Sequence, residues 1–254
     1  MTSGYPSLPA FAGPCASLRR IATRTPLRRR VAELTILAVI CGVLPQCAAP
    51  EPPPEPPATA SAAPPVDTPP QPAVVTPVTA ADLGASWHPG CPVSPAQLRR
   101  VTLTHLGFDA KPHRGQLIVH AQLVDQVVTV FDQLYRLGFP IEKMRTAAAY
   151  PHASDELSME DDNTSAFNCR RIPGSGSWAL HAYGRAIDVN PLLNPSVTGT
   201  RIEPVNAAVY TDRHRIEPGL LHAGDPAVRA FTDRGWAWGG AWRSPVDYQH
   251  FERR

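Results

Sequence analysis

The sequence predicts an α+β domain in which helices pack on one side of a small antiparallel sheet. Two β-prone runs, 101–108 and 116–121, are separated by a turn, which is typical of a hairpin. Residues 121–139 have apolar side chains at the spacing of a helix. Short β-prone runs at 185–190 and 247–252 then enclose one more short helical stretch. We see no internal repeat.

The bounds of the first elements are predicted from residues that begin or end helices and strands. Ser94 can cap a short helix that has Pro95 at its first position. Asp109, Pro112 and Gly115 break the chain between the two runs of the hairpin. The long helix ends at Gly138, and its apolar face is formed by Leu123, Val127, Val130, Phe131, Leu134 and Leu137.

The later elements are shorter. We expect a core strand at 142–150 and then a polar loop at 151–177, which is too long for a simple connection and is therefore expected to line a site. Strands are expected at 185–190 and 247–252. Between them, Asp225 can cap a helix over 225–235 that has Pro226 in its first turn.

Residues 1–49 have the pattern of a targeting segment. Three arginines, Arg28 to Arg30, precede an apolar run from Leu34 to Leu44. That run is shorter than the ~20 residues that span a bilayer, so it favours a secretory signal, with a weak membrane anchor as the alternative. Cys47 is a candidate for lipidation, although Pro45 and Gln46 are poor residues for a lipoprotein cleavage site.

Residues 50–79 are predicted to be a disordered, extended linker. Of the 30 prolines, 12 lie between Pro50 and Pro77, and the segment has no hydrophobic period. The folded domain is therefore expected at 80–254. Of the 24 basic and 22 acidic residues, 6 and 4 lie before residue 78, which leaves 18 of each in the folded part. This neutral balance argues against a nucleic-acid surface.

The five cysteines divide in the same way. Cys15, Cys41 and Cys47 lie in the leader, and only Cys91 and Cys169 remain in the predicted domain. In an exported protein such a pair favours a disulfide, and two free buried thiols are the alternative.

Two histidines and two aspartates near the C-terminus have the chemistry of a catalytic zinc site. His181 and Asp188 are separated by a turn that Gly184 permits, and His250 can join them from a neighbouring strand. Two imidazoles and a carboxylate leave one position of a tetrahedral zinc ion for water. Asp247 can then act as a general base. Taken alone the spacing is weak, because a histidine on a strand is more often packed or hydrogen-bonded than a ligand.

Other polar and aromatic residues have plainer interpretations. The acidic residues between Asp155 and Asp162 lack the spacing of a calcium loop, so we expect a solvated face or a contact with substrate amines. Trp236, Trp238 and Trp242 could stack on sugars, but alternating aromatic residues on a strand are more often core.

Two stretches resemble the D-alanyl-D-alanine carboxypeptidase-like family of zinc peptidases, which includes cell-wall carboxypeptidases, dipeptidases and phage L-alanyl-D-glutamate endopeptidases. They are "HAYGRAIDVNP" and "GWAWGGAWRSPVDYQHFE". The likeness extends over roughly residues 91–252 and implies a fold of the hedgehog and D-Ala-D-Ala peptidase type. It also implies that His181, Asp188 and His250 bind Zn²⁺ and that Asp247 is the base.

The same resemblance implies an arginine upstream of the first ligand, for which Arg170 is the best match and Arg171 a rival. One departure is Ala179, where the family commonly has serine. The expected function is that of an exported, monomeric zinc peptidase of the cell envelope, free or tethered to the membrane, that cleaves peptidoglycan peptides containing D-amino acids. The alternatives are a non-catalytic peptidoglycan-binding module on the same fold and a zinc peptidase with another protein target.

Overall fold

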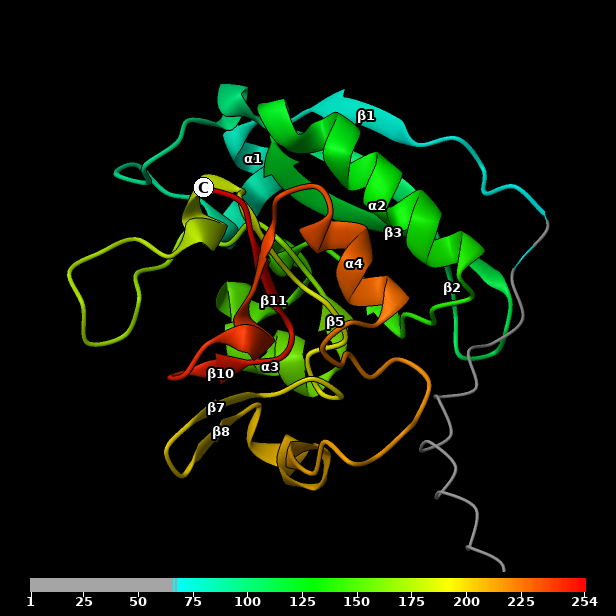
Figure 1. Cartoon of the computed structure of the whole chain (residues 1–254). Helices are drawn as coiled ribbons and strands as arrows, with labels where there is room; N and C mark the ends of the chain where they lie inside the picture. The colour runs from blue at the N-terminus through cyan, green and yellow to red at the C-terminus, as the bar shows by residue number, and fades with distance from the viewer. Residues whose placement is uncertain (1–65, 67) are drawn as a thin grey trace, which may run out of the picture. The chain divides into compact units, whose positions relative to one another are not determined.

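A computed structural model of the chain describes residue 66 and residues 68–254 (Figure 1). The predicted targeting segment at 1–49 and most of the predicted linker lie outside the described residues. The described part is α+β, as predicted, with small antiparallel sheets and a few helices. Within this part of the chain, no helix is both long and apolar enough to cross a membrane.

The first sheet contains the predicted hairpin. Its strands β1 (Val74–Pro77), β2 (Leu98–Leu106) and β3 (Pro112–His120) are antiparallel in the order β1-β2-β3. The strand β1 lies inside the predicted linker, so the domain boundary predicted at residue 80 is too late. Its β-branched residues pair with the open edge of β2, with Val74 opposite Thr102. All four residues of β1 are exposed, so the strand has no alternation of apolar and polar residues from which it could be predicted.

The helix α2 (Val124–Arg136) packs against this sheet, preceded by a 3₁₀ turn, Ala121–Leu123 (Figure 1). It confirms the long helix predicted from apolar spacing, and Gly138 follows it with a φ of +69°. The residues Val127, Val130, Phe131 and Leu134 are buried on its inner face. Each such side chain contributes about 1.5–3 kcal/mol by leaving water, so this layer forms the main hydrophobic core.

The second sheet positions the predicted metal ligands. It consists of β6 (Ala186–Asp188), β11 (His250–Glu252) and β9 (Ala237–Trp238), antiparallel in the order β6-β11-β9. The ring of Phe251 stacks on Phe231 of α4 (Pro226–Thr232), with centroids 3.9 Å apart. Because side chains alternate along a strand, His250 and Glu252 then lie on the other face of β11.

A third sheet holds Asp247 and corrects the prediction of a single strand at 247–252. It is formed by β10 (Val246–Asp247), β7 (Ser196–Thr198) and β8 (Arg201–Glu203) in the order β10-β7-β8. The chain crosses from this sheet to the second one at Tyr248 and Gln249. Its backbone there bonds Pro195 and Val189 instead of continuing one ladder.

The segment 142–177 differs from its prediction. The expected strand is only β4 (Lys143–Met144), which pairs in parallel with β5 (Asn163–Thr164). The side-chain amide of Asn163 accepts a hydrogen bond from the N–H of Arg145 and donates one to its C=O. The β-ladder therefore ends there, and a 3₁₀ turn, Ala147–Ala149, follows. The expected loop contains the helix α3 (Asp155–Glu160), which Ser154 caps through the N–H of Leu157.

The remaining helices are short. The helix α1 (Ala80–Leu83) has a capping box made by Thr79 and Asp82. The helix predicted after Ser94 is a single 3₁₀ turn, Pro95–Gln97. The helix α4 begins after Asp225, as predicted, but the Asp225 carboxylate accepts the N–H of His222 instead of a helix N–H.

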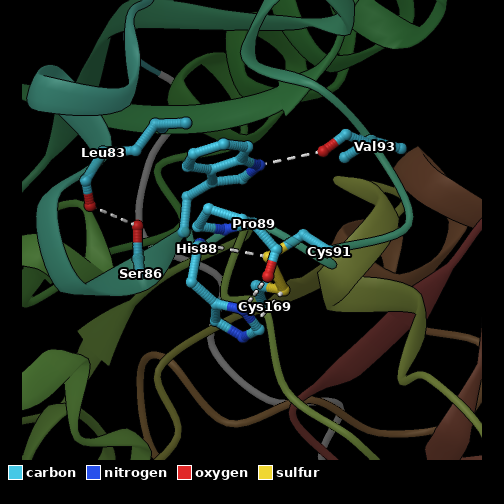
Figure 2. The surroundings of a disulfide bond; sticks show 8 residues. Leu83, Ser86, His88, Pro89, Cys91, Val93 and Cys169 are labelled. Carbon is cyan, nitrogen blue, oxygen red and sulfur yellow. Dashed lines mark hydrogen bonds between the residues drawn. A yellow bond between two sulfur atoms is a disulfide. The ribbon is translucent and has the colours of Figure 1, made fainter.

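The predicted disulfide joins Cys91 and Cys169 across 78 residues (Figure 2). His88 lies beside it, with its Nε2 atom 3.7 Å from the Cys169 sulfur. These three residues are close enough together to suggest a second metal cluster. Because both sulfurs are in the disulfide, neither is a thiolate that could bind a metal.

Candidate metal centre

His181 is held by a sharp turn that only glycine can close. It lies in the 3₁₀ helix Leu180–Tyr183, and Gly184 ends this helix with a left-handed φ of +64°. A Cβ atom on Gly184 would also lie 2.7 Å from the backbone nitrogen of His120. The turn packed against β3 therefore requires glycine on both conformational and steric grounds. Asp188 then ends β6.

His250 faces Asp188 directly. The two residues are partners in the antiparallel register of β6 and β11. On its other side, the backbone of Asp188 exchanges two hydrogen bonds with Ser165, at 2.9 and 3.0 Å. The backbone of Asp188 is therefore fixed by its two bonds to Ser165, and the strand register places it opposite His250. The structure thus brings together all three residues that the sequence predicted as metal ligands.

The ligand atoms lie at the spacing that a zinc ion needs. His181 Nε2 lies 3.1 Å from Asp188 Oδ2 and 3.2 Å from His250 Nδ1, and His250 Nδ1 lies 3.0 Å from Asp188 Oδ1. Zinc bonds of ~2.0–2.1 Å in a tetrahedron place neighbouring ligand atoms about 3.3 Å apart. The three side chains are buried, with 3 to 8% of their residues' surface exposed. One small ion fits this cluster.

Hydrogen bonds on the outer side of each imidazole fix which nitrogen faces the cluster. His181 Nδ1 lies 2.5 Å from the carbonyl oxygen of Ala166, which can only accept, so Nδ1 donates and Nε2 presents its lone pair. His250 Nε2 lies 3.4 Å from a carboxylate oxygen of Glu252 and leaves Nδ1 for the cluster. Two imidazole nitrogens and a carboxylate facing one point are suited to hold a cation between them.

The charges of the site favour a cation in the same way. Burial alone would lower the pKa of His250, but the hydrogen bonds with Asp188 and Glu252 and the charge of Asp247 raise it to about 10. Burial would raise the pKa of Asp188, yet His181 and His250 hold it well below its ordinary value. Carboxylates that stabilise an imidazolium here would also stabilise a bound divalent ion.

Glu252 is a site residue that the sequence analysis did not identify. It lies two positions after His250 on the same strand face, a spacing that could have indicated it. Its second oxygen accepts a hydrogen bond from Arg254 Nε at 3.0 Å. The ring of Trp242 lies 5.3 Å from that of His250, whereas Trp236 and Trp238 belong to the hydrophobic core.

Asp247 is half-buried beside the cluster, and its Oδ1 atom is buried. Its Oδ1 atom has no hydrogen-bond partner among the residues that the structure describes. Burial and the charge of Asp188 raise the pKa of Asp247 to about 6, against the opposing charges of His250, His181 and Arg170. Gly239 makes room for it, because a Cβ atom there would lie 2.6 Å from the Asp247 carbonyl oxygen.

Arg170 also carries an unused polar atom. Its Nη2 atom forms an ion pair of 2.6 Å with Asp155 Oδ2, while its Nε atom is buried and finds no partner within the described part of the chain. Burial would lower the pKa of this guanidinium, but the charges of Asp155, Asp188 and Asp247 raise it. Arg171 instead covers the Trp178 ring at 4.1 Å. The geometry therefore favours Arg170 over Arg171.

The acidic residues between 155 and 162 do not form the solvated face that was predicted. Asp155 pairs with Arg170, and Asp161 pairs with Lys143 at 2.8 Å. Asp162 is buried, because its carboxylate accepts the backbone N–H of Leu192 at 2.9 Å. These three carboxylates thus bind neighbouring groups of the chain, and only Asp162 of the three is buried.

Fold and site together define an α+β domain with a buried His-Asp-His cluster suited to a metal ion. Residues 173–253 match the family described as D-alanyl-D-alanine carboxypeptidase. This match supports the family that the motifs indicated and a peptidase of that general type. It includes His181, Asp188, Asp247 and His250, and it begins just after Arg170. Comparison with curated proteins gave no match, and comparison with solved structures gave none either.

Proposed function

We propose that the protein is an exported zinc peptidase that hydrolyses peptide bonds in peptidoglycan stem peptides containing D-amino acids. The observation that carries this proposal is a pair of buried polar atoms near the cluster, Asp247 Oδ1 and Arg170 Nε, which have no partner among residues 66 and 68–254. One is an acceptor and the other is a donor. Hydrolysis of a peptide bond needs one of each, because water must lose a proton and the carbonyl oxygen gains negative charge.

The residues divide the reaction between them. A zinc ion held by His181, Asp188 and His250 would polarise the scissile carbonyl and lower the pKa of a water molecule. Asp247 Oδ1 accepts the proton of the attacking water and passes it to the leaving amine. Burial and the charge of Asp188 raise the pKa of Asp247 in the metal-free site, and its carboxylate is placed to accept a proton and to return it. Arg170 Nε donates to the carbonyl oxygen as its charge develops.

Localisation and substrate belong to the same proposal. The leader and the proline-rich segment favour export to the cell envelope, with or without a membrane tether. A segment extended as its composition predicts reaches about 3 Å per residue, which would let a tethered domain enter the wall. The substrate is a peptide of the wall, and the described residues contain the disulfide that an oxidising compartment supports.

The test uses the purified protein and muropeptides released from peptidoglycan, with products followed by mass spectrometry. We expect shortened peptides with the zinc-loaded protein, none after chelation, and recovery when zinc returns. Hydrolysis that is indifferent to chelation would contradict the proposal. Asp247→Ala is the matched variant: an enzyme loses turnover and keeps its zinc, whereas a non-catalytic binding module retains muropeptide binding and shows no turnover even as wild type.

A further inference from the structure

We propose that Asp155 is the positioning residue for Arg170, and that its carboxylate turns the guanidinium so that Nε–H points to the reacting carbonyl. This inference rests on the proposed function, because it assigns a task to a residue that does not itself touch the reacting atoms. Asp155 lies in α3, and the family match at residues 173–253 does not include it.

The ion pair is better suited to orientation than to stability. Asp155 Oδ2 lies 2.6 Å from Arg170 Nη2, and the two side chains are 31 and 33% exposed. Partly exposed ion pairs stabilise a fold only slightly. The guanidinium is a rigid planar fork, however, so holding Nη2 also fixes the direction of Nε–H. That N–H is the buried donor without a partner in the described chain.

The carboxylate of Asp155 is itself held at its second oxygen. Asp155 Oδ1 lies 3.4 Å from the side-chain nitrogen of Asn168, and the same nitrogen donates to the carbonyl oxygen of Ala153 at 3.0 Å. Asn168 is buried, with 8% of its surface exposed. One buried amide thus joins the turn before α3 to the carboxylate that orients Arg170.

That turn has an unfavourable backbone. His152 and Ala153 have φ angles of +54° and +52°, which residues other than glycine seldom adopt. Such positions are destabilising and persist only where neighbouring contacts enforce them. Here the contact between Asn168 and Ala153 and the Ser154 cap enforce them, and they bring the start of α3 against Arg170.

The backbone of Arg170 is fixed independently. The preceding residue, Cys169, is in the disulfide, and its N–H donates to Ser86 at 3.0 Å. The carbonyl of Arg170 accepts the N–H of Ala179 at 3.1 Å. The remaining freedom therefore lies in the side chain. Without Asp155, the acids whose charges act on the guanidinium are Asp188 and Asp247. Arg170 would then move toward Asp247, and an ion pair between them would make Asp247 a weaker base.

The test is a double-mutant cycle of Asp155→Asn and Arg170→Ala in the full zinc-loaded protein, assayed on muropeptides. A small misplacement of a catalytic group can lower turnover by about 10- to 100-fold, so Asp155→Asn should reduce kcat by this factor and change KM by less than about threefold. Because both changes act through one guanidinium, the double variant should be no slower than Arg170→Ala alone.

The matched control is Asp161→Asn, which removes the 2.8 Å ion pair with Lys143 next to the other end of α3. It should leave kcat unchanged. Two further readouts separate positioning from unfolding: bound zinc and thermal midpoint should stay near wild type in Asp155→Asn. Affinity for a phosphinate dipeptide, a tetrahedral anion, should fall by about the same factor as kcat.

Each result decides between the alternatives. Normal kcat in Asp155→Asn, or losses that multiply in the double variant, would overturn this inference while the proposed function stands. Loss of zinc or of the fold in Asp155→Asn would also overturn it, because the residue would then be structural. If the wild-type protein shows no zinc-dependent hydrolysis, the proposed function fails and this inference fails with it.

Discussion

The sheet β1-β2-β3 with α2 and the metal centre are built by opposite means. The strands β2 and β3 have nine residues each and bury apolar side chains under a regular helix. The metal centre is built on strands of two or three residues, with buried polar side chains between them. The first region can be stable by hydrophobic burial alone, whereas the second gathers lone pairs and charges that a bound cation would stabilise.

The largest effect is expected from His181→Ala, which tests whether the metal centre depends on zinc while the hydrophobic layer does not. It removes one of the three proposed ligands, so zinc should be lost. Several kcal/mol of transition-state stabilisation should go with the zinc, which corresponds to about a 10³-fold fall in kcat/KM. The hydrophobic layer should remain, so the thermal midpoint should equal that of the metal-free wild type. Metal analysis, kinetics and calorimetry on one preparation check this, and retained zinc would refute the ligand assignment.

The converse change is Phe131→Ala, in the buried face of α2. Large-to-small substitution of a buried phenylalanine lowers the free energy of unfolding by about 3–5 kcal/mol. We expect the same loss in zinc-loaded and metal-free protein, with zinc affinity unchanged, measured by urea unfolding. Thr129→Ala, on the exposed side of the same helix, is the control and should change stability little. A loss confined to the zinc-loaded form would mean that the two regions are coupled.

A pH-dependent prediction concerns Asp162, between α3 and β5. Burial raises the pKa of its carboxyl to about 6, above the ordinary 3.8. The folded state then holds the proton more tightly, so the contribution of Asp162 to stability is greatest below pH 4 and falls as pH rises through 6, by on the order of 2–3 kcal/mol. Asp162→Asn keeps an acceptor for Leu192 without the charge.

We therefore expect Asp162→Asn to unfold like wild type at pH 4 and to be more stable by about that amount above pH 7. The measurement is urea unfolding of metal-free protein across this range, so that metal release at acid pH does not enter. Asp161→Asn should not reproduce the gain. An equal gain at both pH values would show that the carboxyl of Asp162 is not the cause.

The smallest effect is expected from Glu252→Gln, which leaves the three ligands in place. Partners on the outer side of a ligating imidazole typically contribute 10- to 100-fold to metal affinity, so zinc should bind about tenfold more weakly. Competition with a chelating dye measures this. Arg254→Ala removes an exposed contact to the same carboxylate and should change affinity by less than about threefold. Unchanged zinc affinity in Glu252→Gln would show that Glu252 does not support metal binding by His250.

The contrast also explains which parts could be predicted from the sequence. The face of α2 and the hairpin obey local periods, so Val127, Val130 and Phe131 could be recognised without the fold. The cluster of His181, Asp188 and His250 could be predicted because the residue types and flanking motifs are chemically specific. In both cases the information lies in the local sequence.

The errors fall where a partner distant in sequence decides the outcome. The strand expected at 142–150 ends early because Asn163 takes both backbone groups of Arg145. The strand expected at 247–252 is divided because its halves pair with different sheets. Asp155 was assigned to a solvated face because no pattern within α3 indicates Arg170. Periodicity has no information about such contacts.

The link between Cys91 and Cys169 has a consequence for how the protein should be made. It closes a loop of 78 residues, and in the chain-entropy account this removes about 4–5 kcal/mol of unfolded-state freedom. A preparation from a reducing cytosol lacks that restraint beside Arg170. Such material would understate turnover, and secretion or oxidative refolding is the appropriate source for every assay described above.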